Sequence, residues 1–421
     1  MINKGDVLLS GQWEKTEKAD FTMMSLDDVE NYLEKGIEEP CVFEIMKADG
    51  QTKEVILHKE KMRQTQDIVR SYVISDVHKI GYIILPAFYN DADENKPGCA
   101  NDVAREILKL KKENIEGIIL DLRYNGGGSI QEALDLAGIF IDVGPVCMFT
   151  DPSKKPVVLK DMNRGIAWDG PLMLLVNSYS ASASEIVSAA LQDHNRALIV
   201  GQSTYGKSTG QVVLPIDTTI LPDLSNLNLM KKTDGYIKVT DMRIYRIDGS
   251  SHQKRGVIPD LEIPDFFSSD SETEKDSPYA LDNDSISKKA YYTPLAALPS
   301  DSLNRLLSER ILKNEWYRHM EQLSDSLLPY DDPESILFDM KSFKSRYLEI
   351  LKISDELSDL FDNFSGTFNV QNHGYDLELI ATDEYFRLLN ETALKQIRED
   401  YEIQEAVNIM NDFIGIIKPE K

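Results

Sequence analysis

A cluster of serines and one lysine in the middle of the chain have the residue types of a nucleophile and its base. The serines lie in the segment Ser178-Tyr179-Ser180-Ala181-Ser182-Ala183-Ser184-Glu185, and the lysine is Lys207. A seryl hydroxyl is a weak nucleophile at neutral pH, and lysine replaces histidine as its base in some hydrolytic sites. The pattern alone leaves open whether Ser180, Ser182 or Ser184 would attack, because serines at a helix start are usually N-caps.

The serine segment lies where a predicted strand turns into a predicted helix. Residues 172–177 are an apolar run typical of a strand, and residues 183–191 form a helix of small residues. The start of a helix offers unpaired backbone N–H groups and the positive end of its dipole, which stabilise an oxyanion. The N–H of Ala183 is the natural donor next to an attacking Ser182.

A lysine can accept a proton only when it is neutral, so Lys207 should lie in an apolar, water-poor pocket. It follows a predicted strand at residues 197–201 closely enough for such burial. Gln211, four residues further on, could hold the amine in line by hydrogen bonding without adding a negative charge. We therefore expect Ser182, Lys207 and Gln211 to act together.

Residues 63–265 are predicted to form an α/β core, because strands and helices alternate along them. The expected strands are residues 80–85, 115–123, 172–177 and 197–201, and the expected helices are 102–112, 131–141 and 183–191. Right-handed β-α-β units follow from this order, and sites in such sheets gather at the carboxyl ends of the strands. The Gly126-Gly127-Gly128 turn and the serine segment both follow strands, so we expect them to meet.

Residues 1–62 resemble the second half of a PDZ domain. A strand should begin near Val7, a helix should begin after Ser25, and strands at residues 41–46 and 54–58 should form a hairpin around residues 48–50. The alternative is an unrelated hairpin packed on a helix.

Residues 266–294 are acidic and serine-rich and are predicted to be an exposed linker. Residues 295–421 show helical periodicity at 302–312, 339–351 and 383–414, which predicts a helical C-terminal domain. Because no catalytic constellation occurs there, we favour a scaffold or a dimerising surface. The expected fold is thus an α/β core with β-α-β units that carries the Ser/Lys pair, together with a partial PDZ domain and a helical appendage.

Composition excludes several classes of protein. The 421 residues contain 46 Lys and Arg against 71 Asp and Glu, and the net charge of -25 argues against a nucleic-acid partner. Cys41, Cys99 and Cys147 are far apart, so we expect isolated thiols, and no metal or cofactor is predicted. No apolar run is long enough for an integral membrane segment, and no signal-like segment opens the sequence.

Two other catalytic interpretations were weighed. Asp193 and His194 could complete a triad with a serine, but neighbours at one helix end point in different directions, so capping or solvation is favoured. Gly201 to Ser208 formally satisfies the Gly-x4-Gly-Lys-Ser pattern of nucleotide-binding loops. Such a loop opens a helix directly, whereas residues 209–214 are predicted to be a strand.

Taken together, these segments resemble the carboxyl-terminal processing peptidases, most closely the tail-specific protease branch. The likeness rests on the partial PDZ domain and on residues 121–128, 180–185, 192–194, 206–207 and 256–260. In that family the middle serine is the nucleophile and the lysine of Gly-Lys is the base, which implies Ser182 and Lys207. The resemblance also implies Gln211 as the orienting residue and an oxyanion hole made by Ala183 and either Gly127 or Gly128.

The resemblance further implies an endopeptidase that cuts unfolded or tagged proteins near the C-terminus through an acyl-enzyme. Its partners would be polypeptides with unstructured C-terminal tails and possible adaptor proteins, and its compartment the periplasm. A family member would also carry a secretion signal and the first half of the PDZ domain, so the sequence is expected to be N-terminally truncated. The alternative is a non-catalytic PDZ-type binding fragment.

Overall fold

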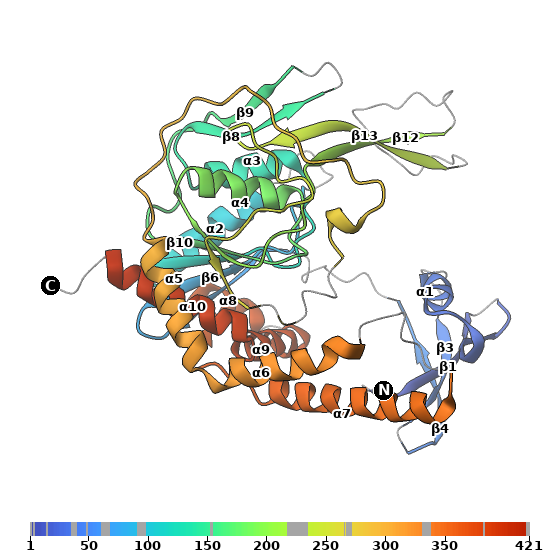
Figure 1. Ribbon diagram of the computed structural model, residues 1–421. Coiled ribbons are helices and arrows are strands. Elements are labelled where there is room, and N and C mark those ends of the chain that lie inside the picture. Colours follow the sequence, from blue (N-terminus) through green and yellow to red (C-terminus); the bar gives the residue numbers. More distant parts are fainter. Residues whose placement is uncertain are drawn as a thin grey trace. The chain divides into compact units, whose positions relative to one another are not determined.

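The computed structural model describes residues 2, 5–13, 16–34, 40–47, 49–59, 68–90, 98–151, 155–216, 235–264, 266, 272–330, 338–381 and 384–417 (Figure 1). The chain divides into two compact units, Met1–Gln66 and Asp67–Lys421. The predicted turn residue Ala48, the predicted boundary at 62 and part of the predicted linker lie outside the described residues.

The described part of the first unit is an antiparallel sheet with one α-helix. Its strand order is β2-β1-β3-β4, and its elements are β1 (Val7–Trp13), β2 (Ala19–Asp20), the short 3-10 helix η1 (Phe21–Met23), α1 (Leu26–Glu34), β3 (Cys41–Met46) and β4 (Thr52–Leu57). Alternate residues of β3 are buried, because side chains of a strand point to opposite faces. The predicted strand, helix and hairpin are confirmed, although β4 begins two residues earlier than expected.

The second unit is built on a mixed sheet of seven described strands in the order β14-β11-β10-β7-β6-β5-β15. The predicted α/β fold is confirmed, since neighbours from β6 to β14 run parallel and helices lie in the connections from β6 to β7, from β7 to β10 and from β10 to β11. The strands are β5 (Arg70–Ser75), β6 (Lys79–Ile84), β7 (Gly117–Asp121), β10 (Leu172–Val176), β11 (Leu198–Gly201), β14 (Leu261–Glu262) and β15 (Asn369–Gln371).

Helices cover both faces of this sheet (Figure 1). One face packs against α2 (Cys99–Lys112), α3 (Ile130–Gly138) and α4 (Ala183–Asp193), and the other against α5 (Ser300–Lys313), α9 (Glu384–Arg398) and α10 (Tyr401–Ile417). Every residue of β7 and β10 is buried, as expected for central parallel strands covered on both sides.

Residues 295–421 were expected to form a helical C-terminal domain, and their described helices pack on the sheet of the second unit. Residues 295–421 belong to the same compact unit as the sheet, and α10 alone places nine buried residues in it. The physical reason is the second face of β7 and β10, whose apolar side chains are covered by α10 together with α5 and α9. The remaining described C-terminal elements are α6 (Glu315–Leu327), η4 (Leu328–Tyr330), α7 (Met340–Asp362) and α8 (Gly374–Ile380).

Most residues in the described part of the predicted linker are exposed, but the segment is attached to the rest of the second unit. It contains η3 (Glu274–Asp276), and further on Ala290 is buried and donates its N–H to the carbonyl of Ile247. This part of the segment is therefore held against the core of the second unit at Ala290.

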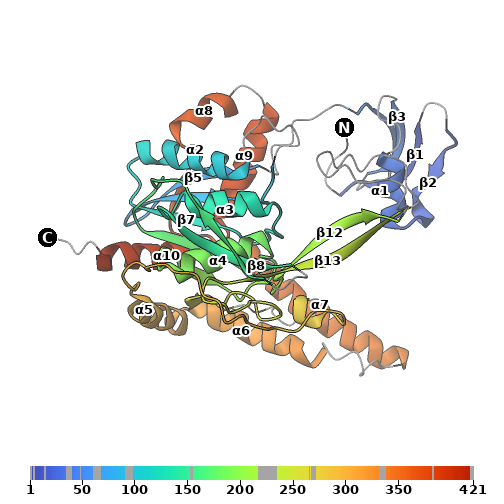
Figure 2. The same cartoon turned by 90° about the horizontal axis from the view of Figure 1, so that it is seen from above.

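A second, antiparallel sheet was not predicted apart from one strand. Its order is β12-β13-β8-β9, with β8 (Gly144–Thr150), β9 (Val157–Asp161), β12 (Thr209–Pro215) and β13 (Tyr236–Tyr245). Figure 2 shows β12 and β13 running on past β8 as a two-stranded arm. The predicted strand at residues 209–214 is confirmed by β12.

The structure also bears on the predictions about the cysteines and about membrane segments. Cys41, Cys99 and Cys147 are buried free thiols, and burial raises the pKa of Cys147 to about 12. Among the described residues, no helix has both the length and the apolar character that crossing a bilayer requires.

Removal of a buried side chain from α10 should destabilise the whole second unit. Met410 is fully buried against the sheet, whereas Met340 on α7 is 77% exposed. We expect Met410→Ala to lower the free energy of unfolding by about 2–5 kcal/mol, because it leaves a cavity in the core. Met340→Ala removes the same atoms and should change it by less than about 0.5 kcal/mol. Chemical denaturation followed by circular dichroism measures both, and equal effects would contradict the integration of α10.

Candidate active site

Ser182 occupies the sharp turn between β10 and α4, where it is the N-cap residue of the helix. Its backbone has φ 56° and ψ -109°, a conformation that a residue with a side chain seldom adopts. Such strain costs about 1–3 kcal/mol and persists only where the surroundings enforce it, often at functional sites. Ser182 itself is partly buried, between the buried residues Ala181 and Ala183.

The glycine turn after β7 meets the serine segment, as the sequence predicted. The carbonyl of Asn125 accepts the N–H of Ala181 at 3.0 Å and the hydroxyl of Ser184 at 2.8 Å. Gly127 has φ 101°, and a Cβ on it would lie 2.8 Å from the Cβ of Ser182 and 3.0 Å from the nitrogen of Ala183. Only glycine fits this close approach of the two segments.

The backbone N–H groups beside Ser182 differ in their availability. The N–H of Gly127 donates to Asn125 Oδ1 at 3.0 Å. The N–H groups of Gly128 and Ala183 have no hydrogen-bond partner among the residues that the structure describes. Two donors therefore remain free next to the serine, one from the glycine turn and one from the start of α4.

The buried carboxylate of Glu185 binds the serine segment and the lysine segment together. Its Oε2 accepts the N–H of Ser182 at 2.8 Å and the N–H of Lys207 at 2.9 Å. Its Oε1 accepts the N–H of Gly206 at 2.7 Å and the hydroxyl of Thr204 at 2.6 Å. Sequence reasoning missed this role, although an acidic residue three positions after an N-cap serine is the signal of a capping box.

Lys207 follows β11 and precedes β12 in a tight loop. Gly206 has φ 95°, and a Cβ there would lie 3.0 Å from the carbonyl carbon of Lys254. Lys207 is partly buried, and no described residue makes a hydrogen bond or ion pair with its ammonium group. The strand that follows Lys207 is incompatible with a nucleotide-binding loop, which opens a helix at this point.

The structure does not bring the Gln211 amide to Lys207. Gln211 lies on β12 beside a bulge, and its amide nitrogen donates to Thr209 Oγ1 at 3.0 Å and Thr240 Oγ1 at 3.3 Å. Its orienting role stays a prediction.

A triad of Ser182 with Asp193 and His194 is incompatible with the geometry. Ser182 caps the start of α4 and His194 caps its end, 11 helical residues or about 16 Å away. His194 Nε2 lies 2.8 Å from the carbonyl oxygen of Pro145, and Asp193 forms an ion pair with Arg246. Both side chains thus hold the far end of the helix.

Residues 79–263, which contain both the serine and the lysine segment, match the model of Peptidase family S41. The match covers less than half of the chain. This similarity supports a serine-type peptidase, and the matched region lies within the predicted core at residues 63–265.

Two similar proteins come from bacteria. The chain is 29% identical over 377 residues to a tail-specific protease of Haemophilus influenzae, covering 87% of this chain and 49% of the relative. It is 30% identical over 216 residues to a probable CtpA-like serine protease of Staphylococcus aureus, covering 51% and 38%. The chain thus spans half or less of the length of these relatives.

A solved structure with some likeness is that of the photosystem II D1 C-terminal processing protease. It is 25% identical, the match covers 62% of this chain and 63% of that chain, and the TM-score is 0.39.

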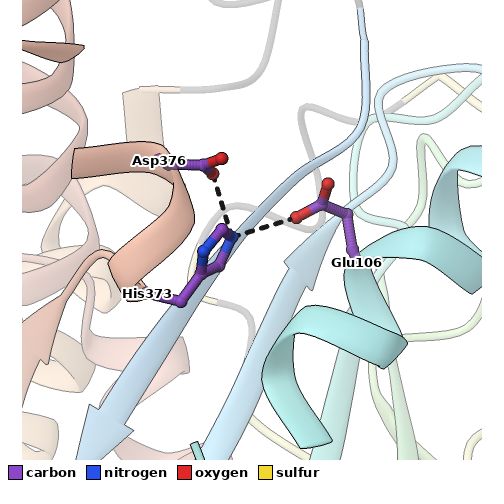
Figure 3. Close-up of side chains that lie close together, drawn as sticks. All are labelled: Glu106, His373 and Asp376. Carbon is purple, nitrogen blue, oxygen red and sulfur yellow. Dashed lines mark hydrogen bonds and ion pairs between the residues drawn. The ribbon is translucent and has the colours of Figure 1, made fainter. Parts of the chain in front are cut away.

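A second constellation lies between α2 and the start of α8 and consists of Glu106, His373 and Asp376 (Figure 3). His373 Nε2 lies 3.3 Å from Glu106 Oε2 and 2.9 Å from Asp376 Oδ2. These atom types could bind a metal ion, but the ammonium group of Lys109 already lies 2.6 Å from Glu106 and 3.1 Å from Asp376. We therefore interpret the cluster as a charge-balanced ion network that attaches α8 to α2.

Replacing Gly127 should disturb the site, whereas replacing its neighbour should not. Gly127→Ala combines an unfavourable φ with a clash against Ser182 and Ala183, so we expect a loss of at least about 2 kcal/mol of stability. It should also slow the labelling of Ser182 by a fluorophosphonate. Gly126→Ala is the matched control, since its Cβ would meet nothing within 4 Å. Equal behaviour of the two variants would contradict the close approach.

The ion network predicts a loss of stability at alkaline pH. Burial disfavours the charged imidazole of His373, but the hydrogen bonds and charges of Asp376 and Glu106 outweigh it and raise its pKa to about 9. An unfolded histidine has a pKa of about 6.5, so the stabilisation is complete below that pH and is lost as pH rises through about 9. The change should be on the order of 3 kcal/mol.

Unfolding measured between pH 6 and 10 tests this expectation. The His373→Gln variant should be the less stable protein at pH 6 and should lack the alkaline loss. His319→Gln, at an exposed position on α6, should keep the pH dependence of the unmodified chain. A His373→Gln protein with unaltered pH dependence would contradict the network.

Proposed function

We propose that this chain is a serine endopeptidase in which Ser182 attacks the peptide bond and Lys207 is its base. The observation that carries the proposal is the Glu185 carboxylate, because one of its oxygens accepts the N–H groups of both residues. The backbone N–H groups of Ser182 and Lys207 thereby meet at a single oxygen atom, although the two residues follow different strands. A serine with a strained backbone and a lysine without a partner carboxylate suit the two roles.

In this mechanism Ser182 Oγ attacks the scissile carbonyl carbon while its proton passes to the Lys207 amine. The resulting oxyanion would accept hydrogen bonds from the backbone. Lys207 then returns the proton to the leaving amine as the C–N bond breaks, which leaves an acyl-enzyme on Ser182. Water, deprotonated by Lys207, attacks the ester carbon. The bond between this carbon and Ser182 Oγ then breaks, Lys207 returns the proton to Ser182 Oγ, and the acid is released.

We propose Ala183 and Gly128 as the oxyanion donors. Of the two glycines that the sequence left open, Gly127 already uses its N–H within the turn, whereas the N–H of Gly128 has no partner among the described residues. Ala183 adds the positive end of α4, which complements the developing negative charge. Gln211 would orient Lys207 only after its amide leaves the hydroxyls of Thr209 and Thr240.

We propose unfolded or tagged polypeptides, cut near their C-terminus, as the substrates. The support is the relative in Haemophilus influenzae, whose name is tail-specific protease. The first unit, with its strand, helix and hairpin, is the proposed partial PDZ domain that would bind substrate tails or adaptor proteins. We also propose a periplasmic location, which rests on the resemblance to the tail-specific protease branch.

Cleavage of an unstructured protein with a small, apolar C-terminal tail tests the two catalytic roles. We expect Ser182→Ala and Lys207→Met each to lower the rate by about 10³-fold or more, since both groups act in the same proton transfer. Ser203→Ala is the control, because Ser203 is exposed in the same loop as Lys207. Mass spectrometry of the fragments measures the rate and locates the cut.

Labelling by a fluorophosphonate separates the alternatives. A folded chain that labels at Ser182 but not after Lys207→Met supports the assembled dyad. A folded chain that neither labels nor cuts would replace the proposal by a non-catalytic binding fragment, and cleavage that survives both substitutions would refute the dyad.

A further inference from the structure

A pocket of about 640 Å³ lies beside the serine segment within the second unit. Its wall comes from two sources: the loops that follow β7 and β10, and the ends of α7 and α9 with the start of α10. The first source is the pair of loops that also carries the proposed oxyanion donor Gly128 and nucleophile Ser182. The pocket therefore shares two loops with the proposed site, although neither Gly128 nor Ser182 lines it.

Two aromatic rings form one edge of the pocket. Tyr124 and Tyr179 stack with their centroids 5.5 Å apart and their planes 24° apart. They remain 69% and 47% exposed, so their outer faces are open to a ligand. Tyr179 lies three residues before Ser182, and Tyr124 lies four residues before Gly128.

The floor of the pocket carries an excess of negative charge. The Arg123 side chain is 6% exposed, and its nitrogens lie 2.7 Å from Asp121, 2.9 Å from Asp400 and 2.5 Å from Glu402. Among the described residues, three carboxylates thus surround one guanidinium. Arg123 has no capacity left for a carboxylate of a ligand, which the neighbouring acids would repel.

Two more carboxylates stand at positions that are unfavourable for their own helices. Asp362 is the last residue of α7, and Glu399 directly follows the last residue of α9, where the helix dipole disfavours negative charge. Asp362 has no ion pair with any described residue, and Glu399 has Lys395 at 3.7 Å, a surface distance worth little. Carboxylates that destabilise their own helices in this way are expected where they bind a ligand.

We propose that this pocket binds an arginine or lysine side chain of the polypeptide that the enzyme cuts. The carboxylates of Asp362 and Glu399 would neutralise the cation, and the faces of Tyr124 and Tyr179 would stack on it. Arginine fits better than lysine, because its planar guanidinium stacks on aromatic rings and is less strongly hydrated. This inference rests on the proposed function, because it assigns a side-chain specificity to that site.

Binding can be measured without any cleavage. We use the full chain with Ser182→Ala and titrate N-acetyl-arginine amide or N-acetyl-norleucine amide by calorimetry. The arginine compound should bind at least about tenfold more tightly, because norleucine has the apolar stem without the cation. Asp362→Asn combined with Glu399→Gln should reduce the arginine affinity about fivefold to tenfold.

A control variant separates the pocket from general charge attraction. Asp355→Asn combined with Glu378→Gln removes the same charge from exposed positions on α7 and α8 and should leave arginine binding unchanged. The thermal midpoint of the pocket variant should stay equal or rise, since two carboxylates leave helix C-terminal ends. Lost binding is then not a consequence of unfolding.

Cleavage of paired peptides then tests the specificity. For two otherwise identical peptides, the one with arginine near the cut site should have a kcat/KM about tenfold higher than the one with norleucine, mainly because its KM is lower. The pocket variant should cleave both peptides with the same kcat/KM. Arginine binding without cleavage of any peptide would support the pocket while the proposed function fails. Cleavage without arginine preference, together with equal binding of the two amides, would overturn the pocket while the proposed function stands.

Discussion

The carboxylate of Glu185 is the interaction on which the geometry of the candidate site depends. A buried carboxylate is costly unless donors satisfy it, and this one accepts four hydrogen bonds. Three of the donors are backbone N–H groups, so their positions are set by the chain and not by flexible side chains. The strained backbone of Ser182 and the loop before Lys207 are therefore held in place by one group.

The sheet supplies the frame within which that carboxylate acts. Parallel strands β7, β10 and β11 end at the same edge, and their connecting loops carry the glycine turn, the serine segment and the lysine segment. Asn125 completes the frame, because its carbonyl and amide groups bond to the serine segment, the glycine turn and the carbonyl of Leu85. The loops are thus rigid parts of the fold, although they lie at its edge.

The C-terminal helices matter to this edge as well as to the core. Glu402 at the start of α10 accepts hydrogen bonds from Arg123 after β7 and from Gln202 after β11. The chain segment that is most distant in sequence therefore fixes two of the loops that border the site. Burial raises the pKa of Glu402, and the nearby Arg123 opposes this shift. These contacts suit the scaffold that the sequence analysis favoured for this region.

The amino-acid sequence by itself determined the elements with strong local signals. Alternation of strands and helices, the apolar runs and the serine and lysine segments predicted the α/β core and the meeting of the serine segment with the glycine turn. These features were predictable because hydrophobic periodicity and turn chemistry act over a few residues. The confirmed strand β12 after Lys207 belongs to the same class.

Only the tertiary structure decided which groups are free and which are occupied. Glu185 accepts the N–H of Gly206, and the N–H of Gly127 donates to Asn125. The Gln211 amide donates to Thr209 and Thr240. Local sequence patterns do not encode these contacts. The same holds for α10 and β15, whose place on the sheet depends on apolar faces left open by distant strands. Hydrogen-bond partners and buried faces are assigned by competition across the whole fold, and for that reason spacing along the chain could not supply them.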